Sequence, residues 1–273
     1  MENSSADSIR SDRSAVKRLS DRGHYDRDLV DRILDAQVMC HIAFVHEGRP
    51  HVIPTLFGRD GDRVLFHGSA LSRMLHAATE GPEICFCVSI LDAMVLARSA
   101  FHHSANYRSV ILYGKPILIE GDAAKNDALR IISDHVLPGR WEECRPPSAG
   151  ELKATTVLAL EIKEGAAKVR AHGAKDDPAD KTLDFWAGLL PVNLQMGNPI
   201  PANDLREDIP LPESIENFRN PLSFQRRRTL TSLEPFDGSG LVVAVPIMEQ
   251  FPTEDRDGLQ GHLSNGEPTE SQA

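Results

Sequence analysis

Hydrophobic residues alternate with polar ones along much of residues 38–170, and this period of two is typical of β-strands. In "VMCHIAFVHEGRPHVIPTLFGRDGDRVLFHGS" (38–69) the alternation is interrupted by two short polar segments, "HEGRP" and "GRDGD". Strands joined by such short turns pair antiparallel. The segment therefore predicts a meander of three antiparallel strands.

More strand-like runs follow the meander. The segment "EICFCVSILDAMVLAR" (83–98) predicts either two strands or one long bent strand that pivots at Leu91–Asp92. Shorter runs lie at 107–120, 155–162 and 166–172. Many short strands with few helices indicate a mainly β protein, a small β-barrel with appended α-helices.

Helical periodicity appears in three places. "YDRDLVDRILDAQ" (25–37) begins with Asp26 as a plausible N-cap, and "SALSRMLHAATEG" (69–81) begins with Ser69 and stops at Gly81. A third helix is expected from Asp122 to Val136, before "LPGRW". The apolar stripes of the first two helices are Leu29, Val30, Ile33 and Leu34, and Leu71, Met74, Leu75 and Ala78.

The pattern divides the chain into three parts. Residues 1–22 are charged, rich in serine and without periodicity, so we expect a flexible N-terminal arm. Residues 23–205 carry the strands and helices and form the compact domain. Residues 206–273 are an acidic, proline-rich C-terminal extension that we expect to be largely irregular, with one strand-like fragment, "GLVVAVPIM".

Composition narrows the possible partners. The 273 residues are 41% hydrophobic and carry a formal net charge of −10, so no overall basic field attracts nucleic acid or an anionic membrane surface. No apolar run is long enough to span a bilayer, and the N-terminus lacks the apolar core of a secretory signal. These observations predict a cytoplasmic protein.

The four cysteines do not form a zinc pattern. Cys85 and Cys87 are separated by one residue within a strand-like run, whereas zinc sites use two or more intervening residues in turn-rich sequence. We expect the cysteines to be small buried hydrophobic residues and no metal to be bound.

The segment "LFHGSALSRML" predicts a phosphate site. A strand ends at His67, Gly68 allows a turn, and Ser69, Ser72 and Arg73 gather at the start of a helix. Hydroxyls, a guanidinium and free backbone N–H groups at a helix N-terminus favour a phosphate. Ordinary helix capping beside a surface arginine is the alternative.

Two other segments offer groups for a ligand. Pro54 in "HVIPTLFG" removes one hydrogen-bond donor from its strand, which indicates either a ligand-facing irregularity or a protected edge. In "HVLPGRWEECRPP", Arg140 and Trp141 follow a helix, where they either stack on a flat ligand or fill a gap against the barrel.

The densest polar segment is "RSAFHHSANYRSV" (98–110). Its adjacent histidines, His102 and His103, point to opposite faces of an extended backbone, which disfavours a shared metal ion. Its serines lack the G-x-S-x-G elbow of a nucleophile. Ser104 and Asn106 lie at the mouth of the following strand, where such donors bind a polar heterocycle or a phosphate.

Taken together and in order, five segments resemble one family. "HVIPTLFGRDGDRVLFHGSALSRML", "LARSAFHHSANYRSVILYG", "HVLPGRW", "KVRAHGAKDDPAD" and "FWAGLLPVNL" resemble the pyridoxamine 5′-phosphate oxidase-like family of FMN-binding split barrels. The resemblance covers about residues 20–205 and is strongest to the flavin-nucleotide-binding branch that includes 5-nitroimidazole reductases. It implies a six-stranded antiparallel Greek-key barrel and a homodimer with FMN in clefts between the subunits.

The resemblance also assigns roles to residues. It implies that "HGSALSR" holds the phosphate and ribityl chain, that "IPTL" runs its backbone along the isoalloxazine ring, and that "SANYRS" adds contacts, some across the dimer. The implied cofactor-binding residues are Pro54, Thr55, Leu56, His67, Gly68, Ser69, Ser72, Arg73, Ser104, Asn106, Tyr107 and Arg108. The arginine-rich substrate motif of true pyridoxamine-phosphate oxidases is missing from 185–205, so that activity is not expected.

These observations lead to a functional hypothesis. We expect a homodimeric FMN-dependent oxidoreductase that passes electrons from NAD(P)H or another donor to a small organic acceptor, with nitroaromatics as one candidate class. His67 is the first candidate for a catalytic proton donor, and a structural histidine is the alternative. Two other functions stay open: a non-enzymatic flavin sensor or carrier, and a haem-binding split barrel, since the chain has eleven histidines.

Overall fold

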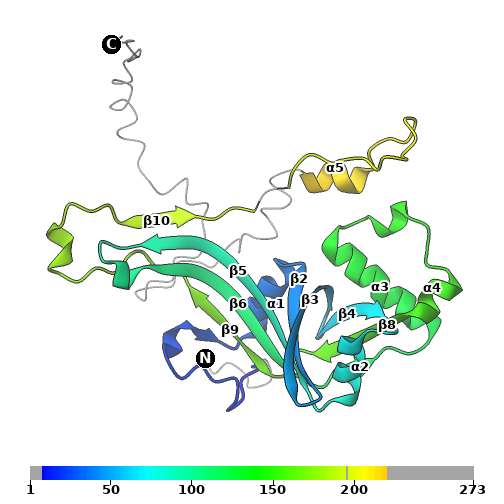
Figure 1. Cartoon of the computed structure of the whole chain (residues 1–273), viewed down its shortest axis with the longest axis horizontal. Helices are drawn as coiled ribbons and strands as arrows, with labels where there is room; N and C mark the ends of the chain where they lie inside the picture. The colour runs from blue at the N-terminus through cyan, green and yellow to red at the C-terminus, as the bar shows by residue number, and fades with distance from the viewer. Residues whose placement is uncertain (1–7, 195, 220–273) are drawn as a thin grey trace, which may run out of the picture.

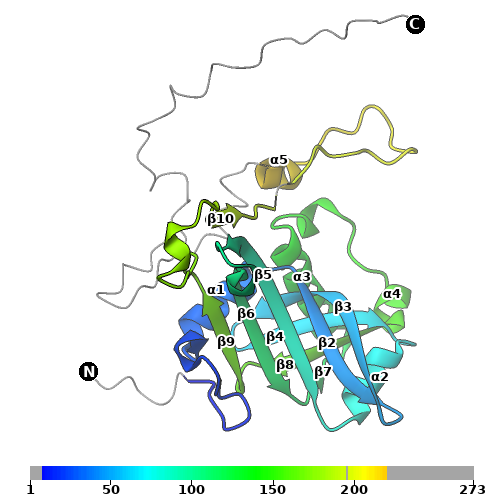
Figure 2. The same cartoon turned by 60° about the vertical axis from the view of Figure 1, so that its left-hand side comes forward.

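The structure is a computed structural model that describes residues 8–194 and 196–219. Within these residues, ten strands form one antiparallel sheet in the order β1-β9-β6-β5-β2-β3-β4-β8-β7, and β10 pairs with β5 (Figures 1 and 2). The strands are β1 (Gly23–His24), β2 (Met39–His46), β3 (Arg49–Asp60), β4 (Arg63–Ser69), β5 (Ile84–Leu96), β6 (Ser104–Gly114), β7 (Ile117–Leu118), β8 (Thr155–Glu161), β9 (Gly165–Arg170) and β10 (Gly188–Pro191). The helices are α1 (Arg27–Asp35), α2 (Arg73–Glu80), α3 (Asp122–Val136), α4 (Ala149–Ala154) and α5 (Glu213–Arg219), with short 3-10 turns η2 (Ser20–Arg22), η3 (Ala100–His102), η4 (Trp141–Glu143) and η5 (Asp180–Thr182).

The sheet curls into the split β-barrel that the sequence predicts, but it is open and has more than six strands. The three-strand meander is confirmed as β2–β3–β4. The two-residue strands β1 and β7 lie at the ends of the strand order, where each pairs with one neighbour in the described part of the chain. Short edge strands of this kind are difficult to predict because they have almost no pattern of their own.

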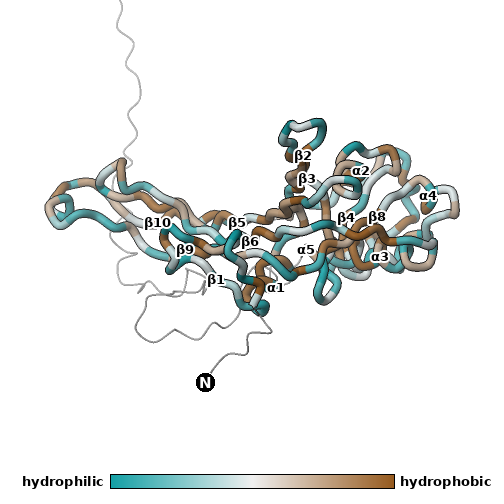
Figure 3. The backbone as a smooth tube through the Cα atoms, turned by 90° about the horizontal axis from the view of Figure 1, so that it is seen from below, coloured by the Kyte–Doolittle hydropathy of each residue, from teal (hydrophilic) through white to brown (hydrophobic). Residues whose placement is uncertain are grey.

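The barrel interior is aromatic and aliphatic. Phe57, Phe66 and Phe86 are fully buried, and the rings of Phe57 and Phe86 meet edge to face with centroids 5.1 Å apart. The helix α1 covers part of this core with the predicted stripe Leu29, Val30, Ile33 and Leu34, and the side chain of Asp26 caps it by accepting from Leu29 N at 2.9 Å. The first helix is therefore confirmed with its cap. Figure 3 shows apolar stretches of the tube in α1, in the central strands and in α3.

The helix α3 covers the outer side of β3, β4 and β8. It contributes Ala128 and Ile132 to a second buried cluster that includes Leu65 of β4 and Val157 of β8. Gly58 of β3 allows this close packing, because a Cβ atom there would lie 2.8 Å from the Cα of Ile132. The predicted bounds of α3 are confirmed.

The long strand β5 confirms one of two expected alternatives. It is a single strand with a bulge between Leu91 and Ala93, at the predicted pivot. Beyond the bulge, β5, β6 and β10 form an arm that extends from the barrel (Figure 1). Asp92, the residue that bulges, forms a bidentate ion pair with the buried Arg108.

The predicted start of the second helix is wrong. Ser69 is the last residue of β4, where it pairs with Thr155 of β8, and α2 begins only at Arg73 with Ser72 as N-cap. Strand pairing across the sheet overrides the local capping signal of Ser69. Leu71 consequently lies in the turn before the helix, where it is 90% exposed, while the rest of the predicted stripe is buried.

The N-terminal segment differs from the expected arm over residues 8–22. Ile9 is 2% exposed within the main core, and its carbonyl accepts a hydrogen bond from Gly165 N. Arg13 pairs with Glu83 and Glu164 and lies over the ring of Tyr113. These partners are distant in sequence, so the charged composition of the segment gives no sign of them.

The C-terminal extension is described only as far as residue 219. It contains α5, and its Ser214 N donates to the Glu143 carboxylate at 3.0 Å, so residues 213–219 are not irregular. The predicted strand "GLVVAVPIM" lies outside the described residues. No helix in the described part of the chain is long and apolar enough to cross a membrane.

Candidate functional site

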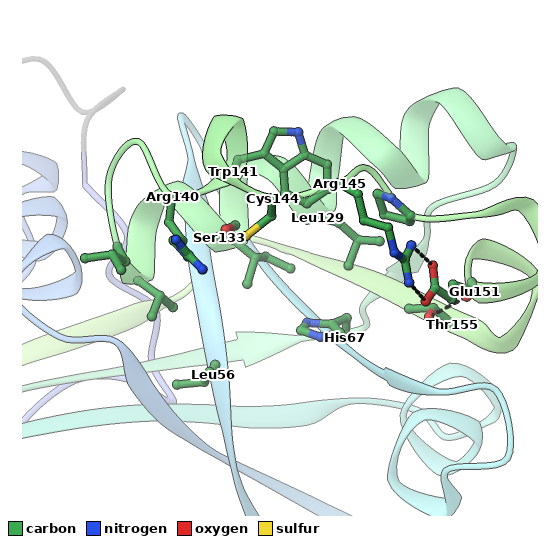
Figure 4. A pocket seen from close by; sticks show the side chains of 14 residues that line it. Leu56, His67, Leu129, Ser133, Arg140, Trp141, Cys144, Arg145, Glu151 and Thr155 are labelled. Carbon is green, nitrogen blue, oxygen red and sulfur yellow. Dashed lines mark hydrogen bonds and ion pairs between the residues drawn. The ribbon is translucent and has the colours of Figure 1, made fainter. Parts of the chain in front are cut away.

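A cavity of about 710 Å³ lies between the outer face of the sheet and the helix α3, and we call it the α3 cavity (Figure 4). His67 of β4 and Leu56 of β3 contribute from the sheet side. The α3 segment contributes mainly apolar side chains. The remaining lining residues are Leu129, Ile132, Ser133, Val136, Leu137, Arg140, Trp141, Cys144, Arg145, Pro147, Glu151 and Thr155.

His67 is the most unusual group in this cavity. Its Nδ1 is buried and has no hydrogen-bond partner among the described residues. Burial lowers the pKa of His67, because the charged imidazolium loses its hydration. His67 is therefore neutral at physiological pH. A neutral, half-buried imidazole is a good metal ligand and a poor proton donor.

Two arginines lie at the exposed rim of the cavity. Arg145 forms a two-point ion pair with Glu151 at 2.6 and 2.8 Å, and Arg140 pairs with Glu143 at 3.3 Å. Between them, Trp141 and the exposed Cys144 line the opening (Figure 4). Trp141 thus borders an open space and does not fill a closed gap. The sequence predicts a buried Cys144, but this residue is exposed.

The arrangement has a clear chemical character. The walls are apolar, one neutral imidazole faces the space, and cationic groups are confined to the rim. Such a site suits a flat apolar molecule that offers a metal to the imidazole and anionic groups to the solvent side. No group of three or more His, Cys, Asp or Glu side chains in the described part of the chain could hold a metal ion alone.

The predicted ring-binding segment lies on the free edge of β3. Pro54, Thr55 and Leu56 pair with β2 on one side, and pairing with β4 begins only at Phe57. Pro54 and Leu56 are exposed and Thr55 is half-buried. The segment therefore has backbone groups available to a ligand, and Leu56 also lines the α3 cavity.

The predicted phosphate residues lie where β4 passes into α2. Ser69 O accepts from Ser72 N at 2.8 Å, which closes the turn, and Gly68 packs closely against Leu75. The side chain of Ser72 makes no capping hydrogen bond, so the first N–H groups of α2 do not donate to its hydroxyl. Arg73 is exposed at the start of this helix.

The third predicted group, residues 104–108, lies on the β5–β6 arm, where two of its side chains bind other residues of the same chain. The Asn106 side chain accepts from His172 N at 3.1 Å and from the Arg170 guanidinium, and Arg108 is paired with Asp92. Ser104 and Tyr107 are half-buried. The structure thus brings His67 and Leu56 to the α3 cavity and places residues 104–108 on a different part of the sheet.

Sequence reasoning missed most of the α3 cavity. Leu129, Ile132 and Val136 belong to the apolar face of a helix whose bounds are predicted, but periodicity does not say what that face meets. Arg145 carries no signal in the sequence. The one useful indication is "HVLPGRWEECRPP", which marks Arg140 and Trp141 as candidates for contact with a flat ligand.

Comparisons with known proteins point in one direction. Residues 26–169 match a family model described as pyridoxamine 5′-phosphate oxidase. The flavocytochrome Anf3 from Azotobacter vinelandii is 42% identical, with a TM-score of 0.73 over 77% of this chain and 97% of that chain. An FAD- and haem-binding protein from Mycobacterium smegmatis is 36% identical, with a TM-score of 0.69 over 71% of this chain and 96% of that chain.

More distant matches add little. A proposed 5-nitroimidazole antibiotic resistance protein from Bacteroides thetaiotaomicron is 19% identical, with a TM-score of 0.46 over 63% of this chain and 90% of that chain. No curated protein matches the chain.

Proposed function

The chain belongs to the pyridoxamine 5′-phosphate oxidase family, and we propose that it is a redox protein that binds a flavin together with a haem. Two similar proteins support this proposal, one a flavocytochrome and the other a protein that binds FAD and haem. Within the chain, one observation carries it: His67 faces the α3 cavity with a buried nitrogen that has no partner among the described residues. The sequence hypothesis named haem only as an alternative.

The residues of the α3 cavity fit a haem. His67 would ligate the iron, and its lowered pKa keeps the imidazole neutral and ready to bind metal. Arg140 and Arg145 at the rim would pair with the propionates, while the apolar side chains of α3 would enclose the ring. Bound there, haem supplies one-electron chemistry that none of these side chains provides.

The residues at the free edge of β3 and the start of α2 fit a flavin. Pro54, Thr55 and Leu56 offer backbone groups, and Ser72 and Arg73 offer a hydroxyl, a guanidinium and a helix N-terminus for a phosphate. A bound flavin supplies the two-electron chemistry. The sequence resemblance implies FMN, whereas the similar protein from Mycobacterium smegmatis binds FAD, so we propose FAD as the first candidate and FMN as the second.

A second copy of the chain would complete the flavin site. The candidate flavin residues lie on an exposed surface, and the same part of the sheet exposes the apolar side chains of Met39, Val45 and Val52, each at least 48% exposed. An exposed apolar surface of this kind is typical of an interface. We therefore propose a homodimer with the flavin between the subunits.

We propose an oxidoreductase that takes electrons from NAD(P)H or another reduced donor and delivers them to a small organic acceptor. Addition of NAD(P)H under argon should bleach the flavin band, and a panel that includes nitroaromatic acceptors should restore it. A flavin band that no donor bleaches would indicate a sensor or carrier.

The haem assignment is tested by removing the imidazole. We expect the purified protein to show a Soret band and His67→Gly to lose it, with the flavin band retained, because the His67 side chain is not among the groups that we assign to the flavin. Added imidazole should enter the space left by the side chain and restore the Soret band. His46→Gly, a change on the exposed β2–β3 hairpin, is the matched control. Full haem content in folded His67→Gly would refute the assignment.

The flavin assignment needs a separate measurement. Flavin released by heat and separated by chromatography distinguishes FAD from FMN. Loss of released flavin in Arg73→Gln, with the Soret band retained, would support the start of α2 as its phosphate site. Unchanged flavin content would remove Arg73 from that role.

A further inference from the structure

Arg170, the last residue of β9, is a buried cation without a counter-charge in the part of the chain that the structure describes. Arg170 is only 5% exposed to solvent. The guanidinium donates to neutral acceptors, namely the Asn106 amide oxygen and the carbonyl oxygens of His172 at 3.2 Å and Gly173 at 3.4 Å. Its Nε has no partner, and no carboxylate in residues 8–194 and 196–219 forms an ion pair with it.

More positive charge surrounds Arg170. Pairing of β1 with β9 brings Arg22 into this region, and the Nε of Arg22 is also buried without a partner among the described residues. Burial lowers the pKa of Arg170, and the nearby charge of Arg22 lowers it further. The pKa of His172 is lowered by burial and then by Lys175, Arg170 and Arg22, against a smaller opposing effect of Asp21.

Two other arginines, Arg98 and Arg108, each have an aspartate as counter-charge. Arg108 is held by Asp92 through two hydrogen bonds of 2.7 and 3.0 Å, and Arg98 is paired with Asp176 at 2.7 Å. A buried charge without a counter-charge is strongly unfavourable, so the pairing of Arg108 and Arg98 with aspartates makes an unpaired Arg170 unexpected. The missing negative charge must then come from outside the described chain.

We propose that Arg170, Arg22 and His172 form a binding site for a phosphate-type anion. Two guanidinium groups present planar, fork-shaped donors that match phosphate oxygens, and the unpartnered Nε atoms give each of them a free donor. The two guanidinium charges suit a dianion better than a single carboxylate, and the His172 imidazole, whose pKa is lowered, adds a neutral N–H donor. Asn106 and the carbonyl oxygens of residues 172 and 173 hold the Arg170 guanidinium in place by accepting from Nη1 twice and from Nη2 once, which leaves Nε and the second Nη2 hydrogen for the anion.

The phosphate has two possible sources. Tyr107, a predicted flavin residue, pairs with Arg170 across β6 and β9, so one source is the flavin nucleotide itself, with a phosphate bound here in addition to, or instead of, the start of α2. The other is a separate substrate that carries a phosphate. The anion site itself does not depend on the proposed function, but the choice of the flavin as its source does.

The experiment combines phosphate binding with flavin content. Titration calorimetry with inorganic phosphate, at ionic strength matched with chloride, is carried out on the purified holoprotein and on Arg22→Gln and His172→Gln. Arg22 and His172 are half-buried, so substituting them should disturb folding less than substituting the buried Arg170. Circular dichroism verifies that each variant is folded. Arg63→Gln, which removes an exposed arginine paired with Asp60 on β4, is the matched control.

Each result decides the proposal. If the flavin supplies the phosphate, the holoprotein binds no free phosphate, and both variants lose flavin at least about fivefold while keeping haem. If a substrate supplies it, the holoprotein binds free phosphate, and both variants weaken this binding at least about tenfold with flavin content unchanged. Folded variants that change neither quantity overturn the site. A wild-type protein without flavin would contradict the proposed function, yet its phosphate titration would still test the site.

Discussion

Gly58 sets how closely α3 approaches the sheet. A Cβ atom at this position would lie 2.8 Å from the Cα of Ile132 and 3.1 Å from the carbonyl oxygen of Ile131. Both are backbone atoms that cannot rotate away. Since Ile132 also lines the α3 cavity, a single hydrogen atom in place of a side chain helps to define the width of the proposed haem site.

Gly58→Ala should therefore destabilise the protein. We expect the free energy of unfolding to fall by about 1–3 kcal/mol, the usual range for overpacking, and haem retention to decrease because α3 must move outward. Urea denaturation followed by circular dichroism measures the first effect, and the Soret absorbance per chain measures the second. Gly197→Ala, where nothing lies within 4 Å of the added Cβ, should change neither. Equal midpoints for both variants would contradict this account.

At the scale of elements, α4 is secured by a capping box that also borders the cavity. Ser148 Oγ accepts from Glu151 N, and the Glu151 carboxylate accepts from Ser148 N at 2.7 Å. The Arg145 hydrogen bonds and then those of Ser148 lower the pKa of Glu151 from 4.5 to about 2. The charged carboxylate thus connects the helix start to the rim arginine.

This depressed pKa predicts a pH dependence. A folded-state pKa below the unfolded value means that the Glu151 interactions stabilise the protein above about pH 4.5 and that this contribution disappears as the pH falls towards about 2. Glu151→Gln should unfold at a lower urea concentration than wild type at neutral pH, and the difference should shrink on acidification. Glu161→Gln, which alters an exposed pair with Lys163, is the control. A difference that persists undiminished at about pH 3 would contradict the assignment.

At the scale of the whole molecule, the outer face of the central strands is unusually apolar. Cross-strand pairing places Met39 and Val45 of β2 on the same face as Val52 and Leu56 of β3. A monomer that exposed this surface would be prone to association. The surface is the basis of the proposed homodimer.

Val52→Glu should weaken the dimer. A charge at a residue that is 61% exposed in the single chain changes its folding little, but burying that charge between subunits is unfavourable, so we expect the dimer dissociation constant to rise at least about tenfold. Sedimentation velocity over a concentration series measures it. Ile117→Glu places the same charge on β7, at the far edge of the sheet, and should not dissociate the dimer. A wild-type monomer at all concentrations would contradict the proposed interface.

Local pattern determined a large part of this molecule. The antiparallel meander, the cap of α1 at Asp26, the bounds of α3 and the bend near Asp92 all follow from residues within a few positions of one another. The five ordered sequence segments were enough to predict the family and the split-barrel fold. Such features are visible in sequence because hydrogen bonding and burial within one element repeat with that element's own period.

Tertiary structure decided the chemistry of the sites. His67 differs from ten other histidines because α3 leaves a cavity beside it, and Arg170 differs from Arg108 because only the latter meets an aspartate across the bulge. Ser69 stayed in a strand because β8 pairs with it. In each case the deciding partner lies far away in the chain. Charge compensation, burial and open space depend on distances through space, which a sequence pattern does not contain.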